Sequence, residues 1–439
     1  MKKFLIILVV LSLISYLGYN FWQSKQNQNH FGYLTVKSLT QGANIFVIEI
    51  DKQCTGQCEL KIAPGFYNIM VSNEGYQDWQ NKVEVKENQR LEISDIRLIP
   101  YSSKMEALIS GKIVNYLLLP NKNQIVYILQ NNLKSFEVYV YNRLDKSNKS
   151  LLKLESEPII EKASSDSSDL IFKLPKGALF NNIKLKTDNW FVLGVNKSLT
   201  NNYIDINVKF KKILTTLKNS VIEQVIWQPS SNQRLAIKTE KEIYLLDMIE
   251  NEVFPVAKDV GSYIFSDESF IYFLNISGLI KRYNPALNEL ITVSSSSLPF
   301  KEIKDLRLFN IISKNKMILI YQNESLAWVY ADSKMQPLTT SISFAKTGTG
   351  SDVFLLFKSL EMERYPAKQV ISKENIKDAW LTDKDQWVIF LNNKITYFDP
   401  RNDSYMDILE YKEENHPQFD ADLNYLYFLD EEGLKRISL

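Results

Sequence analysis

The amino-acid sequence predicts an all-β protein preceded by a single apolar helix at the N-terminus. Aromatic residues make up 12% of the 439-residue chain, and flat aromatic rings pack well on the pleated surface of strands. Gly and Pro number only 14 and 13, so the turns use Asn, Asp, Ser and Lys, as in 121–123. Asn and Asp tolerate left-handed backbone conformations and serve in turns. Short apolar stretches separated by such turns recur along most of the chain.

Bulk composition indicates a globular chain without an electrostatic preference for nucleic acid. Hydrophobic residues make up 45% and charged residues 23%, as is typical of folded proteins. A chain of this length is expected to form roughly two or three domains. Because 52 Lys and Arg nearly balance 51 Asp and Glu, the formal net charge is +1. No basic surface is predicted, and we expect no nucleic-acid partner.

Residues 1–22 predict a transmembrane anchor. An uncharged apolar run over 4–22 follows Lys2 and Lys3. A helix of about 19 residues spans about 28 Å, close to the thickness of the hydrocarbon core. The two lysines favour a cytoplasmic N-terminus, which would place the rest of the chain outside the cytoplasm. The predicted location is therefore the cell membrane, with one span and extracytoplasmic C-terminal domains.

A cleaved signal peptide is the alternative for this segment. Cleavage needs small residues at defined positions, and 15–18 (Ser-Tyr-Leu-Gly) is a poor site. The polar stretch that follows predicts a short linker over 23–31.

Residues 32–100 predict a small β-sandwich. About seven short strands alternate with turn signals, a number that fits a sandwich. Pro64 and Gly65 match the two corners of a type II turn, because Pro presets φ at the first corner and Gly supplies a positive φ at the second.

The only two cysteines, Cys54 and Cys58, flank a short turn in this segment. In an exported protein, this spacing could close a disulfide at the tip of a hairpin. Free thiols are the alternative. A zinc site would need more ligands, and the only histidines, His30 and His416, lie far away in the sequence.

This segment resembles the PEGA domain family. The resemblance covers most of 32–100 and depends on residues 32–36, 42–43, 64–67 and 74–76, followed by Trp79. Thr40 and Gln41 stand where the family's naming motif has Pro-Glu. Such domains are typical of extracytoplasmic, surface-associated prokaryotic proteins and have no known catalytic residues. The resemblance therefore implies a stalk or adhesion module.

Residues 101–439 contain a repeated pattern of an apolar strand, a turn, a strongly apolar strand and a third strand. The second strand is the clearest, and it recurs at 124–129, 169–172, 234–237, 270–274, 317–321, 353–357, 386–391 and 425–429. Most intervals are about 35 to 47 residues, which is the period of four-stranded propeller blades. The pattern predicts a β-propeller of about eight blades, with seven as the alternative.

Two irregularities of the repeat lead to further predictions. One interval is longer than the rest, so 176–220 should hold an insertion or a degenerate blade. The last repeat stops after its third strand, and residues 104–109 could supply the missing fourth strand. That pairing would remove an exposed strand edge.

The repeats resemble the TolB-like and WD40-like propeller families. The closest match is the turn at 227–232, Trp-Gln-Pro-Ser-Ser-Asn. Because propellers host many unrelated functions, this resemblance implies a fold and no activity.

No catalytic constellation is recognised in the sequence. The two histidines fall in the linker and in a polar turn, and no nucleophile elbow, P-loop or dinucleotide-binding motif is present. We therefore predict no catalytic, cofactor-binding or metal-binding residues and no cofactor. Trp227 and Trp380 could line a ligand-binding face, although packing between blades is the interpretation we favour for both.

The function predicted from these features is that of a membrane-anchored, extracytoplasmic binding or scaffold protein. Its propeller would face a protein or glycan partner of the cell envelope. The alternative is a cell-envelope hydrolase that acts on glycan or peptide, with carboxylates from several blades in the propeller channel.

Overall fold

The computed structural model describes most of the chain beyond residue 30. The described residues are 15–16, 31–101, 105–132, 134–195, 203–213, 221–229, 231, 233–265, 270–294, 306–312, 317–322, 326–331, 334–338, 344–347, 354–357, 362–365, 369–372, 376–382, 386–400, 404–410, 412, 415–420 and 422–439. Two compact units are present. Unit 1 comprises Met1–Met105, Thr396–Leu409 and Ser438–Leu439, and unit 2 comprises Glu106–Ile395 and Glu410–Ile437.

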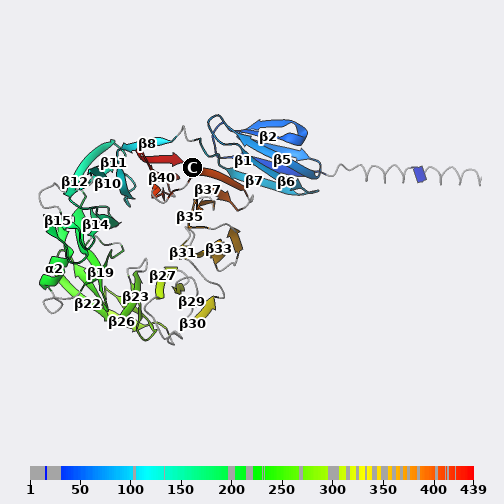
Figure 1. Cartoon of the computed structure of the whole chain (residues 1–439). Helices are drawn as coiled ribbons and strands as arrows, with labels where there is room; N and C mark the ends of the chain where they lie inside the picture. The colour runs from blue at the N-terminus through cyan, green and yellow to red at the C-terminus, as the bar shows by residue number, and fades with distance from the viewer. Residues whose placement is uncertain are drawn as a thin grey trace, which may run out of the picture. The chain divides into compact units, whose positions relative to one another are not determined.

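An N-terminal β-domain within unit 1 consists of two sheets, with strand orders β4-β1-β7 and β3-β2-β5-β6 (Figure 1). Its elements are β1 (Gly32–Ser38), β2 (Asn44–Val47), the 3₁₀ turn η1 (Ile48–Ile50), β3 (Lys52–Thr55), β4 (Gln57–Ile62), β5 (Gly65–Ser72), β6 (Trp79–Val85) and β7 (Arg90–Ile96). Strand β1 pairs parallel with β7 and antiparallel with β4.

Alternation along the strands produces the core of this domain. Successive side chains of a strand point to opposite faces, so every second residue can be buried. Leu34 and Val36 of β1 are fully buried, as are Ile69 and Val71 of β5, while their neighbours face outward. Each sheet thus buries one face, as a small sandwich requires.

Eight further four-stranded sheets follow among the described residues, each built mainly from strands that are neighbours in sequence (Figure 1). The first two have the orders β12-β11-β10-β9 and β13-β14-β17-β18. Their strands are β9 (Ile113–Leu118), β10 (Gln124–Asn132), β11 (Ser135–Asn142), β12 (Ser147–Leu154), β13 (Ile159–Ala163), β14 (Asp169–Leu174), β17 (Asn189–Gly194) and β18 (Tyr203–Asp205).

The third to seventh sheets run in simple sequence order, from β19 to β38. Their strands are β19 (Ile222–Trp227), β20 (Arg234–Thr239), β21 (Glu242–Asp247), β22 (Glu252–Lys258), β23 (Val260–Phe265), β24 (Ile271–Asn275), β25 (Ile280–Asn284), β26 (Glu289–Thr292), β27 (Leu306–Ile312), β28 (Met317–Gln322), β29 (Leu326–Ala331), β30 (Lys334–Leu338), β31 (Phe344–Thr347), β32 (Phe354–Phe357), β33 (Met362–Tyr365), β34 (Gln369–Ser372), β35 (Asp378–Leu381), β36 (Trp387–Phe390), β37 (Lys394–Asp399) and β38 (Ser404–Glu410).

The last sheet has the order β39-β40-β41-β8 and joins the two ends of the repeat region. It consists of β39 (Gln418–Asp420), β40 (Tyr425–Asp430), β41 (Gly433–Ser438) and β8 (Glu106–Ser110). Strand β8 pairs antiparallel with β41, and Arg436 Nη2 lies 2.6 Å from Glu106 Oε2 across the pair. The predicted donation of a strand from the start of the repeats to their end is confirmed.

The long second repeat holds an insertion, as the spacing predicted. It contains the short hairpin of β15 (Leu179–Phe180) with β16 (Ile183–Lys184), and helix α2 (Ile206–Ile213). The Asp205 carboxylate accepts the Val208 N–H at 3.0 Å, as a helix N-cap does. The helix buries Ile206 and Phe210 against the third sheet, in a cluster that includes Tyr244.

The all-β prediction is confirmed, but the predicted fold class is wrong in two respects. Among the described residues, no helix is long and apolar enough to cross a membrane. The predicted transmembrane segment 1–22 lies outside those residues except for Ser15 and Tyr16, as does the linker 23–31 except for Phe31. The strands also form separate sheets, and no closed propeller sheet is seen in the described part of the chain.

Both corrections have a physical reason. The hydropathy of a run of residues measures their preference for an apolar environment, and this preference alone does not establish a membrane-spanning helix. The repeat period, in turn, reflects hydrogen bonding within each repeat, whereas ring closure depends on how side chains pack between repeats. The period therefore predicted the number of sheets and carried no information on closure.

Gly433 tests the pairing of β8 with β41. Its φ of +141° is rarely adopted by other residues, and an added Cβ would overlap the carbonyl oxygen of Ile109 on β8. We expect Gly433→Ala to accelerate amide exchange in 106–110 by about tenfold or more, because strain of this kind costs roughly 1–3 kcal/mol. Hydrogen–deuterium exchange with mass spectrometry measures this directly.

Gly177→Ala is the matched control, since Gly177 also has a positive φ (+90°) but the nearest atom to an added Cβ is Lys184 Cε at 3.9 Å. Exchange in 106–110 should be unaffected by this change. Equal exchange in the two variants would show that the contact of Gly433 with β8 is unimportant.

Candidate functional site

The first and last sheets of unit 2 meet at a junction with an aromatic core. Its buried members are Ile109, Ile113, Tyr116, Ile125, Tyr127, Tyr141, Tyr427, Leu429 and Leu434. They come from β8, β9, β10, β11, β40 and β41, so residues from both ends of the repeat region share one cluster. Burial raises the pKa of Tyr116 well above its ordinary value, so its side chain is a neutral part of this core.

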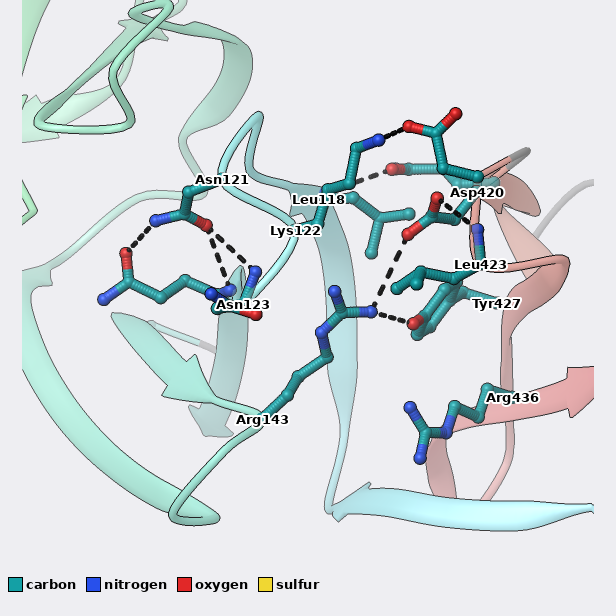
Figure 2. A network of polar contacts seen from close by, with 12 residues as sticks. Leu118, Asn121, Lys122, Asn123, Arg143, Asp420, Leu423, Tyr427 and Arg436 are labelled. Carbon is teal, nitrogen blue, oxygen red and sulfur yellow. Dashed lines mark hydrogen bonds and ion pairs between the residues drawn. The ribbon is translucent and has the colours of Figure 1, made fainter.

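A buried ion pair crosses this junction (Figure 2). Arg143 lies in the turn after β11, and its Nη1 is 3.8 Å from Oδ2 of Asp420 at the end of β39. The two side chains are only 9% and 8% exposed. The same Arg143 nitrogen donates a hydrogen bond to the hydroxyl of Tyr427 on β40. The guanidinium thus links two strands of the last sheet to the first sheet.

Gln418 makes a second link, from β39 to β9. Its side-chain Nε2 donates to the Tyr116 carbonyl oxygen at 2.7 Å, and its Oε1 accepts the Leu118 N–H at 3.2 Å. One carboxamide therefore forms hydrogen bonds with both a donor and an acceptor of the β9 backbone. Buried backbone groups need such partners, and here a side chain provides them between two sheets.

The turn beside the junction is organised by Asn121. Its Oδ1 accepts the N–H groups of Asn123 (3.1 Å) and Gln124 (3.2 Å), which is the Asx-turn geometry expected of Asn in turns. Lys122 at the turn has a φ of +59° and forms an exposed ion pair with Asp422 (Figure 2).

Two pockets open near the junction. The larger, of about 720 Å³, is lined by four carboxylates and three ammonium groups. One of these is Lys435, whose Nζ lies 2.6 Å from Asp430 Oδ2 and 2.7 Å from Glu432 Oε2. Hydrogen bonds to these carboxylates raise the pKa of Lys435. The mixture of both signs in this pocket suits polar ligands.

The smaller pocket, which we name the Trp380 pocket, has a volume of about 360 Å³. It is lined by Asn115, Lys377, Asp378, Trp380, Phe390, His416, Pro417 and Gln418. Most of these residues lie on or directly before the first strands of three sheets, β9, β35 and β39, and Phe390 ends β36. Ligand pockets of proteins are typically about 300 to 1,000 Å³, so this pocket has room for a small ligand.

The structure separates the two predicted ligand-face tryptophans. Trp227 ends β19 and is 3% exposed in the core shared with Trp190 and Leu235, so it packs in the interior. Trp380 on β35 is half-buried and contributes to the pocket described above. The two residues therefore lie in different sheets and in different surroundings.

Cys54 and Cys58 lie far along the chain from this junction, in the N-terminal β-domain. A disulfide joins them across the turn at Gly56, with a Cα–Cα distance of 5.4 Å. His416 lines the Trp380 pocket, whereas His30 lies outside the described residues. In the part of the chain that the structure describes, no group of three or more His, Cys, Asp or Glu side chains could hold a metal ion.

The sequence reasoning missed Arg143, Gln418 and Asp420 as junction residues. Each sits in or beside a polar turn, where such residues are common. The only signal was the predicted pairing of 104–109 with the last repeat, which implies that the first and last sheets are neighbours.

Comparison with known proteins identifies one part of the chain. Residues 31–98 match the PEGA domain, which confirms this resemblance within nearly the predicted bounds. The PEGA domain suggests an extracellular or surface role in binding or as a scaffold. No curated protein matches the chain.

One similar solved structure is titled "Crystal structure of the eukaryotic initiation factor". It shares 13% identity, with a TM-score of 0.49, over 76% of this chain and 86% of that chain. A likeness at this level supports no inference about function. The comparisons give no direct support to the TolB-like or WD40-like resemblance.

Removing one member of the Arg143–Asp420 pair should destabilise unit 2. We expect Arg143→Met to lower the free energy of unfolding by about 3 kcal/mol, because it removes the cation that neutralises the Asp420 carboxylate at this buried position. Urea denaturation followed by fluorescence measures the change. Adding Asp420→Asn to Arg143→Met should restore part of the loss, since the unpaired charge is then removed.

Lys122→Met is the matched control for this prediction. Lys122 and Asp422 also form an ion pair between the two sheets, but their side chains are 42% and 68% exposed. Exposed pairs contribute less than about 1 kcal/mol. A loss in Lys122→Met as large as that in Arg143→Met would contradict the importance of burial.

Proposed function

We propose that this protein acts outside the cytoplasm, at the cell surface, as a binding or scaffold protein. The observation that carries the proposal is the PEGA domain match over residues 31–98. In this proposal the β-domain serves as an attached module, and the repeat region provides the surface that meets a protein or glycan of the cell envelope.

The disulfide in the β-domain supports an extracytoplasmic location. Disulfides persist in oxidising compartments and are rare in the cytosol, where thiols are kept reduced. Cys54 and Cys58 are the only cysteines of the chain. Their oxidation state in cells therefore reports the compartment without interference from other thiols.

The pockets at the junction of the first and last sheets support a binding role. Both are lined by side chains that donate and accept hydrogen bonds. Residues from the two ends of the repeat region hold the strands that line these pockets in register. Rigid elements position binding groups more accurately than loops do.

Thiol labelling in intact cells tests the proposed location. The variant Cys58→Ser leaves Cys54, which is half-buried, whereas Cys58 itself is 1% exposed. We expect a membrane-impermeant maleimide to label Cys54 of this variant in intact cells. The wild-type protein should be labelled only after a membrane-impermeant phosphine has reduced the disulfide.

A Cys54→Ser, Cys58→Ser double variant controls for labelling at other groups and should remain unmodified. Labelling of Cys58→Ser only after lysis would place the β-domain inside the cytoplasm and contradict the proposal. Labelling of the wild-type protein without a reductant would show that the disulfide is absent in cells.

A further inference from the structure

The Trp380 pocket combines an aromatic surface with hydrogen-bonding groups from separate sheets. Asp378 and Trp380 are two residues apart on β35 and so share one face of that strand. Asn115 and Gln418 belong to β9 and β39. All of these side chains line one pocket of about 360 Å³.

The indole of Trp380 is held in a defined orientation. Its ring centre lies 4.0 Å from that of Phe390, and the two planes are at 80°. Trp380 pairs with Val388 on β36, so Phe390 is its diagonal neighbour across the two strands. Phe390 is only 1% exposed and is thus anchored in the core. A preorganised aromatic surface loses little conformational entropy when a ligand binds to it.

Two of the polar side chains of the pocket, Asn115 and Gln418, are uncharged amides, and the others are Lys377, Asp378 and His416. The Asn115 Oδ1 accepts the Tyr116 N–H at 2.7 Å, while no described contact uses the two N–H donors of Asn115. Both ends of the Gln418 carboxamide are bound to the β9 backbone, which makes it a fixed wall. The Asp378 Oδ1 accepts the Ala379 N–H at 2.7 Å, and this bond fixes the carboxylate at the start of β35.

We propose that the Trp380 pocket binds a saccharide. A pyranose ring in which the hydroxyls are equatorial presents a face of C–H groups, and these pack against an indole. Its hydroxyls, at the ring edge, both donate and accept hydrogen bonds, so they match amide and carboxylate groups. This inference rests on the proposed function in one respect, because the saccharide is taken to come from a glycan of the cell envelope.

Other ligand classes match the pocket less well. A phosphate group would require converging cations, but the Asp378 carboxylate stands next to Lys377 at the pocket wall. A purely apolar ligand would desolvate the Asn115 donors without replacing their hydrogen bonds, which opposes its binding. Saccharides satisfy the indole and the amide at once.

Indole resonances of the full chain provide the test. The chain has seven tryptophans, and the Trp380 signal in a ¹H–¹⁵N correlation spectrum is assigned from its loss in Trp380→Phe. The probes are cellobiose and the β-1,4-linked dimer of N-acetylglucosamine, whose rings have equatorial substituents. We expect at least one of them to shift the Trp380 signal saturably.

Two variants locate the binding energy. Trp380→Phe should weaken binding about twofold to tenfold, because the smaller ring covers less of the sugar's C–H face. This variant has lost the Trp380 signal, so its affinity is measured by isothermal titration calorimetry. Asn115→Asp keeps the acceptor for the Tyr116 N–H and removes the amide donors, so it should also weaken binding. Phe66→Leu, which changes an aromatic residue that is 60% exposed on the β-domain, should leave binding unchanged.

Three outcomes would overturn the inference. They are the absence of a shift with both disaccharides, binding that survives Trp380→Phe at full strength, and saturable binding of inorganic phosphate in their place. The thiol-labelling experiment measures the compartment of the β-domain, not the ligand of the pocket. A cytoplasmic β-domain would contradict the proposed location, and the saccharide titration would still be valid. A failed titration would contradict saccharide binding, and the proposed location would still stand.

Discussion

The pairing of β8 with β41 is the constraint on which the rest of unit 2 depends. The two strands are joined across 330 positions of sequence, as the bond from Arg436 to Glu106 shows. Closing so long a loop costs conformational entropy, which must be offset by many contacts formed together. Without β8, strand β41 would present an unpaired edge, and such edges promote association with other chains.

The junction supplies those contacts in a particular combination. Its core is aromatic and apolar, and the ion pair of Arg143 with Asp420 is buried beside it. A buried ion pair contributes less to stability than to specificity, because desolvation opposes the attraction between the charges. Apolar side chains alone could pack in several registers of the two sheets. The Arg143 guanidinium contacts both Asp420 and Tyr427 only in the observed register, so the ion pair favours this one alignment.

This alignment also determines the geometry of the Trp380 pocket. Gln418 binds the backbone of β9 and at the same time lines the pocket, while Asn115 lies on β9 itself. A shift of β39 along β9 would move these groups relative to each other. The residues that stabilise the meeting of the first and last sheets are therefore the ones that position the polar side of the binding surface.

Local patterns in the sequence predicted those features that depend on local interactions. Strand alternation and turn residues predicted the strands, the number of repeats, the insertion near 176–220 and the pairing of β8. The features that depend on packing between distant segments were not accessible. For both Trp227 and Trp380 the sequence left open a ligand-binding face or packing between blades, yet one is buried in a core and the other borders a pocket. Arg143 and Asp420 each resemble an ordinary turn residue, and only the fold makes them partners.

Charge balance completes the physical description of the surface. The formal net charge is +1, and Lys435 of the larger pocket is neutralised by Asp430 and Glu432. Long-range electrostatic steering requires an excess of one sign, and the chain as a whole carries none. In the saccharide proposal, recognition comes from short-range contacts, namely packing on the Trp380 indole and hydrogen bonds to polar side chains of the pocket. The Trp380 pocket holds both kinds of group on elements that the junction keeps rigid, and neutral ligands with many hydroxyls gain most from that combination.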